Sequence, residues 1–356
     1  MAVNARQTRI GIKKATSGSW GTGTAVATAV GAGDGYRVRD DMGIQLQQMY
    51  SYDDSAGQSF IGSVQAGNTE AVRVSIPMYL DYNDTFNNRL WGAVFGTGGT
   101  SPSQVGTTTA YTNTFEPATT KTGQYFTIVR DKVQYISEVP GAKCTGFELT
   151  FGEAGRAEIT WNFIGDKENS DSSINTSTQV SALTYPTQGL RAFMRQAVLR
   201  LNSQSGGALD STSIVKFSSL TFRFVETEDE IHVGGQATLI EPEITDHMLS
   251  ELEVTFPRFD SGTDDFFAAH RDVSAYKGDL TLTGPAIAGS TYTLLFQFPN
   301  LCVPSNASPV PGGGGNVAVN VRLRAMSTTT APTGMSGVTV PLRLTTTGSS
   351  TSNPFA

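Results

Sequence analysis

Short segments in which apolar and polar residues alternate are the feature that most constrains the fold of this chain. Apolar side chains occupy every second position over residues 147–151, 157–163 and 220–224. The same alternation returns over residues 317–323 and 338–344. A period of two is typical of β-strands that bury one face and expose the other. We therefore expect an all-β protein whose strands pack through one face.

The composition favours the same fold class. Charged residues make up only 16% of the 356 residues, whereas 38 residues are glycine. Few charges together with abundant glycine and threonine indicate strands joined by many turns. We expect short helices only, one with Asp84 as its N-cap and Gly96 at its end, and one that follows Thr263.

An internal repeat predicts two similar domains in tandem. The strand pattern of Val72–Pro77 recurs in Leu252–Pro257, 180 positions later, and Asp84 and Phe86 match Asp264 and Phe266 at the same spacing. A strand, a proline and a short capped helix thus occur twice. We expect two domains within these predicted limits: an N-terminal arm (1–35), a first domain (36–170), a linker (171–188), a second domain (189–345) and a flexible tail (346–356).

Charge and hydropathy restrict the classes of partner. The net charge is −7 and the pI about 5.1, which disfavours a protein that grips the phosphates of nucleic acid. A smooth acidic surface past which DNA slides remains compatible with this balance. No apolar run approaches the roughly 18 residues that a membrane span needs, and residues 1–14 lack an apolar signal core. We expect a chain made in the cytoplasm that does not interact with membranes.

Residues able to carry catalysis are present but lack the spacing of known sites. No histidine among His232, His247 and His270 has a partner at metal-ligand spacing. Cys144 follows Lys143, which could lower the pKa of its thiol, but no histidine base is near in sequence. Cys302 lies in an apolar run and is expected in the core.

Glycine-rich and acidic segments also lack the complete patterns of known sites. Gly312–Gly315 lacks the lysine of a phosphate-binding loop, and Gly18–Gly23 is no complete dinucleotide fingerprint. One acidic group is expected at a solvated hairpin tip, and a second follows it without a calcium-binding or committed acid–base pattern. The groups are Glu226, Glu228, Asp229 and Glu230, then Glu241, Glu243 and Asp246. We expect no catalytic, cofactor-binding or metal residues, no cofactor, and no enzymatic activity.

Several glycine-rich and aromatic segments carry a family resemblance. They are Ile10–Lys13, Ser19–Thr22, Gly31–Tyr36, Phe60–Ser63, Ile76–Gly96 and Pro140–Phe147 with the strand of residues 155–165 that follows. Together they resemble the tail tube (major tail) proteins of bacteriophages with long, non-contractile tails. The resemblance covers most of the first half of the chain and, more loosely, the second.

The resemblance implies both an architecture and a set of partners. The resemblance implies two tandem tail-tube-like domains, each a β-sandwich or barrel with one short helix. Tube domains of this family join their sheets side by side around a channel, six domains to a ring, so two domains in one chain would give a ring of three chains. Rings would stack through long loops, for which residues 42–60 and 227–236 are candidates. Implied partners are further copies of the chain, the tape measure, tip and terminator proteins, and double-stranded DNA that passes without specific binding. The implied location is the virion tail.

Other functions stay open at this point. A distal tail, tip or terminator protein with a related fold would carry similar patterns. A carbohydrate-binding β-sandwich would share the alternation, and a glycan hydrolase would need a pair of carboxylates that the sequence does not single out.

Overall fold

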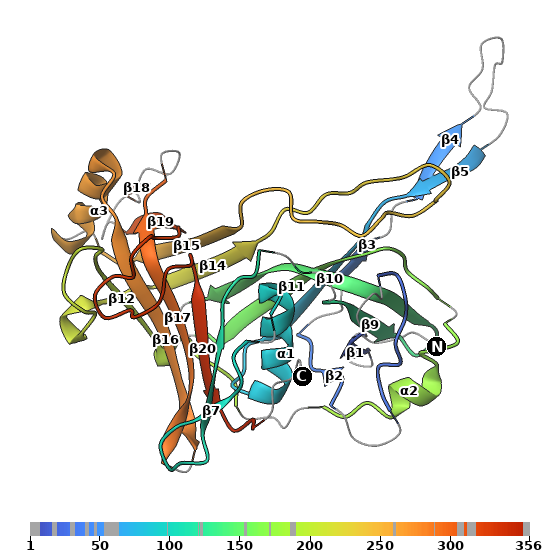
Figure 1. The fold of residues 1–356 in the computed structure, drawn as a ribbon, viewed down its shortest axis with the longest axis horizontal. Coiled ribbons are helices and arrows are strands. Elements are labelled where there is room, and N and C mark those ends of the chain that lie inside the picture. Colours follow the sequence, from blue (N-terminus) through green and yellow to red (C-terminus); the bar gives the residue numbers. More distant parts are fainter. Residues whose placement is uncertain are drawn as a thin grey trace, which may run out of the picture.

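The computed structural model shows an elongated body built almost entirely from antiparallel strands (Figure 1). It describes residues 8–15, 20–28, 33–39, 43–45, 48–52, 64–97, 99–119, 121, 124–152, 155–170, 172–185, 190–258, 261–287, 289–304, 310–311 and 318–351. The prediction of an all-β protein with short helices is confirmed.

The first half of the chain contains eleven described strands and two helices. The strands are β1 Arg9–Lys14, β2 Gly35–Tyr36, β3 Gly43–Gln45, β4 Gln48–Tyr52, β5 Val64–Thr69, β6 Val72–Tyr79, β7 Ser103–Gln104, β8 Tyr111–Phe115, β9 Phe126–Asp131, β10 Ile136–Phe151 and β11 Ala157–Gly165. The helices are α1 Asp84–Phe95 and α2 Ser177–Ser181.

The second half adds nine described strands, one helix and two short 3₁₀ turns. The strands are β12 Ala197–Ser203, β13 Ile214–Val215, β14 Ser219–Val225, β15 Leu249–Phe256, β16 Tyr276–Ile287, β17 Ser290–Cys302, β18 Val310–Pro311, β19 Val319–Ala325 and β20 Arg343–Gly348. The helix is α3 Ser261–Asp272, and the turns are Met194–Gln196 and Ser211–Ser213.

The same order of paired strands occurs in both halves. In the first half, neighbouring strands run β3-β6-β11-β10-β9-β1. In the second half they run β14-β15-β19-β17-β16-β12. Each half also places its long helix directly after the second strand of this order, α1 after β6 and α3 after β15. The arrangement of strands therefore repeats along the chain, as a duplicated domain would.

Most of the alternating segments form the predicted strands. Their apolar residues are buried in β10, β11, β14 and β19, with polar residues on the opposite face. The strand predicted over 338–344 is wrong in its first part, because β20 begins only at Arg343. Gly337 has a φ of 73° and Val338 closes a turn onto Met335, while Pro341 has no N–H to donate to a neighbouring strand.

The two long helices are both present, with shifted starts. Asp84 is the first helical residue and not the cap, since Asn83 precedes it as N-cap. Helix α3 begins at Ser261, before the predicted start after Thr263. Strand β15 begins 177 positions after β6 (249 − 72), and α3 begins 177 positions after α1 (261 − 84). The predicted spacing of 180 is therefore wrong for both elements, and Asp264 is not the equivalent of Asp84.

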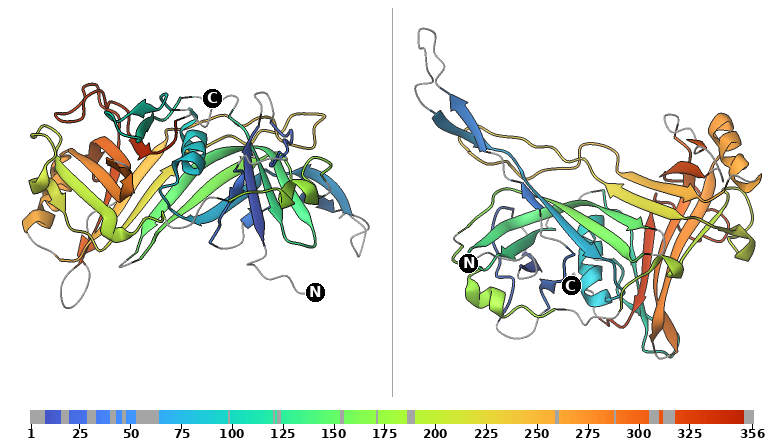
Figure 2. Two further views of the ribbon diagram at one scale, coloured as in Figure 1. Left: turned by 90° about the horizontal axis from the view of Figure 1, so that it is seen from below. Right: turned by 180° about the vertical axis from the view of Figure 1, so that it is seen from behind.

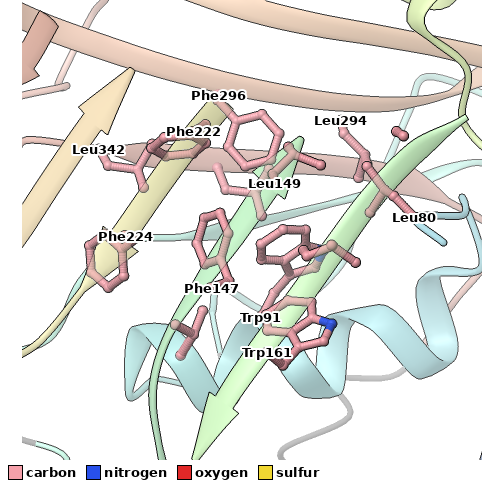
Figure 3. Close-up of a cluster of buried hydrophobic side chains, with 14 of the residues drawn as sticks. Leu80, Trp91, Phe147, Leu149, Trp161, Phe222, Phe224, Leu294, Phe296 and Leu342 are labelled. Carbon is pink, nitrogen blue, oxygen red and sulfur yellow. The ribbon is translucent and has the colours of Figure 1, made fainter. Parts of the chain in front are cut away.

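One aromatic core spans both halves (Figure 3). The indole of Trp91 on α1 lies 5.1 Å from the ring of Phe147, 4.7 Å from that of Trp161 and 5.6 Å from that of Phe296, measured between centroids. Phe147 in turn contacts Phe222 of the second half at 5.1 Å. All five side chains are buried, so the packing that stabilises one half also stabilises the other.

The described parts of three segments predicted to lie outside the domains include residues of the folded body. Residues 9–14 of the predicted arm form β1, which pairs with β9 over its whole length. In the predicted linker, Val180 and Leu183 pack on Val26. In the predicted tail, Thr346 is buried within β20, where its hydroxyl bonds to the Asn88 side chain at 3.1 Å. The limits of the two domains stay a prediction.

Candidate assembly surfaces

The two halves join through a strand pair that makes their sheets continuous. Strand β10 pairs antiparallel with β14 from Gly146 opposite Val225 to Phe151 opposite Leu220. A side chain at Gly146 would place its Cβ 2.2 Å from the carbonyl oxygen of Phe224, so the close approach of the two strands requires glycine there. We call this pair the joint.

Each end of the joined sheet terminates in a strand with one described neighbour. Strand β3 pairs only with β6 among the described strands, although its counterpart β14 pairs with both β15 and β10. At the other end, β18 pairs with β19. It occupies the same place in the second half as the last part of β10 does in the first half, where that part pairs with β11. The chain therefore presents at its two ends the two strand edges that meet in its middle at the joint.

A long hairpin extends from the body next to β3. Among the described strands, β4 and β5 pair only with each other, and they lie away from the main sheet, as both face views show (Figures 1 and 2). The hairpin connects β3 to β6. It includes part of the predicted stacking loop 42–60, of which residues 43–45 and 48–52 are described.

The equivalent connection in the second half joins β14 to β15 and lies across the first half. We call residues 226–248 the strap. It runs from these two strands toward the β4–β5 hairpin (Figure 1), and isolated bridges pair its outgoing and returning parts. It contains the second predicted stacking loop, residues 227–236.

Lysines of the first half anchor the strap by ion pairs. Lys121 pairs with Glu226, and its ammonium also donates to the carbonyl of Cys144 at 2.7 Å. Lys143 pairs with Glu241 at 2.7 Å and donates to the carbonyl of Pro242 at 2.5 Å. Both lysine side chains are almost fully buried. Glu226, one of the acidic residues expected at a solvated tip, is thus buried and holds the strap on the first half. The sequence gives no sign of this ion pair, because Lys121 lies far from Glu226 in the chain.

Apolar and neutral contacts reinforce this anchor. Leu239 of the strap is buried against Ala71 and Ile164, and the indole N–H of Trp20 donates to the carbonyl of Leu239 at 3.3 Å. These partners come from separate segments of the first half. The surface that the strap covers therefore forms only when the first half is folded.

Two strap carboxylates titrate near neutrality. Burial raises the pKa of Glu226 to about 7 and that of Glu228 to about 7, in each case against the lowering effect of Lys121. One carboxylate oxygen of Glu228 is buried without a hydrogen bond. When Glu228 is ionised, its partly unpaired buried carboxylate therefore lowers the stability of the fold.

The face of the joined sheet opposite the core is polar and crosses both halves. We call it the polar face. Adjacent strands align its side chains in rows, one of which runs Pro77, Thr160, Glu148, Arg223, Glu251, Arg324. The next row runs Tyr79, Glu158, Thr150, Thr221, Glu253, Arg322.

A family model for phage tail tube proteins matches residues 5–243. The chain belongs to this family. The match covers the whole first half, the joint and much of the strap, whereas β15 to β20 follow it. A search of curated proteins found no match.

Membership in the tail tube family makes the chain a structural subunit of a phage tail. A subunit of this kind works by self-assembly with copies of itself and with other tail proteins. No described helix has the length and apolar character to cross a membrane.

The tail tube subunit brings two of the candidate chemical residues together, since the ammonium of Lys121 lies beside both Cys144 and Glu226. Among the described residues, no three of the His, Cys, Asp and Glu side chains are grouped to hold a metal ion. Burial raises the pKa of the Cys144 thiol to about 12, in spite of Lys121 nearby, so this cysteine is not the activated thiol that the neighbouring Lys143 could suggest. Cys302 is partly buried and burial also raises the pKa of its thiol. Gly312–Gly315 and part of Gly18–Gly23 lie outside the described residues.

Proposed function

We propose that three copies of this chain close into a ring, and that stacked rings form the channel through which DNA leaves the virion. In each contact, β3 of one copy would pair with the edge of the next copy that carries β18. The joint within each chain would then recur between chains, giving six similar domains around a ring.

The joint is the observation that carries this proposal. It already brings a β14 edge, equivalent to β3, against a β10 edge, equivalent to the region of β18. A chain that ends in both partner edges can repeat the contact head to tail, and a head-to-tail contact that closes gives a ring. Edge strands left open in a monomer promote association.

The layering of the chain supports placing the polar face on the inside. The core, both long helices, and the strands β20 and β8 lie on the other side of the joined sheet. A closed ring has a smaller circumference inside than outside. The bulkier side of the sheet, which carries the core and the helices, therefore fits on the outside of the ring. The polar face would then line the channel.

The β4–β5 hairpin and the strap supply surfaces for contacts between rings. They extend from the same side of the joined sheet, and the hairpin already lies beyond the body of its own chain (Figure 2). Tape measure, tip and terminator proteins would meet the tube at its interior and ends. In this role the chain needs no catalytic residue, and we propose none.

Negative-stain electron microscopy of the purified protein at high concentration tests the proposal. Hollow tubes, or stacked rings with a central channel, are expected. Closed single rings that never stack would instead favour a terminator or tip protein. A chain that stays monomeric even when seeded with sheared tails would contradict the tube proposal.

A further inference from the structure

One row of the polar face alternates acid and base across four consecutive strands. Glu148 on β10, Arg223 on β14, Glu251 on β15 and Arg324 on β19 are direct neighbours in register. The row crosses the joint, so its first member belongs to one half and the other three to the second.

Each arginine of this row is held by a glutamate of the same row. Nε of Arg223 lies 2.7 Å from Oε2 of Glu148, and Nε of Arg324 lies 3.3 Å from Oε1 of Glu251. These side chains face solvent, with exposed fractions of 44% for Arg223 and 48% for Arg324. The guanidinium groups are thus accessible from the polar face, yet each is paired.

The pairing continues elsewhere on the described part of this face. Arg39 pairs with Glu158, and Arg73 with Glu230 of the strap. In the second row, Glu253 lies opposite Arg322 and accepts a hydrogen bond from Asn320 at 2.8 Å. Within the four-strand row the acids and bases balance, with Glu148 and Glu251 against Arg223 and Arg324.

Stability alone is a weak reason for such a row. Exposed ion pairs contribute only about 0–1 kcal/mol each. Arginine, in contrast, is the residue that binds phosphate most readily, because its planar fork matches two phosphate oxygens. Arginines on a surface that DNA must pass would retard the DNA unless their charge were neutralised locally.

We propose that the glutamates of this row keep the polar face from binding DNA by occupying its arginines. The inference rests on the proposed function, since it assumes that DNA passes this face. It differs from a general acidic repulsion, because the row is balanced in charge and its cations are paired.

Fluorescence anisotropy with a labelled duplex of random sequence at low salt tests the inference on the purified, unassembled protein. Wild type should bind weakly or not at all. The variant E148Q/E251Q, which leaves Arg223 and Arg324 in place, should bind at least tenfold more tightly. Its affinity should fall with salt, with a slope steeper by about two, since each new phosphate contact adds roughly 0.9.

Two matched variants separate the arrangement from net charge. E116Q/D272N removes the same charge and the carboxylates that pair with Arg343 and Arg271 away from the polar face; it should bind no better than wild type. Adding R223Q/R324Q to E148Q/E251Q should abolish the gain.

The inference is overturned if correctly folded E148Q/E251Q, judged by circular dichroism, gains no binding, or if E116Q/D272N gains as much. Unchanged binding after R223Q/R324Q is added would also overturn it. Electron microscopy of the same wild-type preparation reports separately on the tube proposal, so a failure of one is distinguishable from a failure of the other.

Discussion

The residues that follow the two long helices differ in type although they share one backbone conformation. Helix α1 is followed by Gly96 with a φ of 68°, and α3 by Val273 with a φ of 53°. Glycine accepts this left-handed conformation without cost, but a β-branched residue is strained there. Val273 is also 81% exposed, so its side chain gains little from burial.

We therefore predict that Val273→Gly stabilises the protein. Relief of strain should exceed the entropy that glycine adds to the unfolded chain, giving a rise of about 0.5–1 kcal/mol in the free energy of unfolding. Urea denaturation measures this change. Gly96→Ala should act in the opposite direction, because its Cβ would lie 2.5 Å from Cγ of Lys121. A destabilised V273G would show that the strain is absent.

The raised pKa of Glu228 predicts how stability depends on pH. Because the folded state holds a proton up to about pH 7 and the unfolded state only to about 4.5, the folded state binds more protons between these values. The free energy of unfolding should therefore fall as pH rises through this window. Glu228→Gln removes the titrating group, and should stabilise the protein by about 1 kcal/mol at pH 8 but not at pH 4.

Thermal denaturation across this pH range measures the effect. Glu243→Gln is the matched control, since Glu243 is an exposed acid on the same strap. An equal stabilisation in both variants would assign the effect to net charge and not to the buried carboxylate.

At the scale of elements, the hairpin and the strap occupy equivalent places in the two halves but have different surroundings. The strap lies on a neighbouring set of strands, whereas the β4–β5 hairpin has no such set beside it among the strands that the structure describes. We infer that the hairpin acts in assembly and contributes little to the fold of the isolated subunit.

Replacing residues 46–70 by a short glycine-rich turn should therefore separate folding from assembly. We expect the midpoint of thermal unfolding to change by less than a few degrees, while tube formation is lost. Removing residues 352–356 serves as a control for shortening the chain. Tubes of normal length from the hairpin variant would show that the hairpin is dispensable.

Local patterns predicted the elements well, and failed where distant segments decide. Alternation identified β10, β11, β14 and β19, because burial of one face imposes a period of two on each strand by itself. The start of β20 was predicted too early. The apolar alternation runs through residues 338–344, but Gly337 and Pro341 prevent the first of these residues from joining a strand. The pairing of Lys121 with Glu226 left no local signal, because it depends on the strap crossing the first half.

At the scale of the whole molecule, the shared core predicts cooperative unfolding. Trp91 and Phe147 of the first half pack with Phe296 and Phe222 of the second, so neither half can unfold without exposing aromatic surface of the other. Calorimetry of the unassembled subunit should show one transition, and Trp91→Ala should lower the free energy of unfolding by about 3–5 kcal/mol. Two separate transitions would indicate independent domains.

The central claim is that the joint within one chain is repeated between chains. Cryo-electron microscopy of tubes viewed end-on tests it most directly, because the number of chains in a ring and the number of similar lobes can be counted separately. We predict three chains and six lobes per ring, with β3 of each chain beside the β18 edge of the next. Six chains in a ring, or a contact that leaves β3 unpaired, would contradict the account.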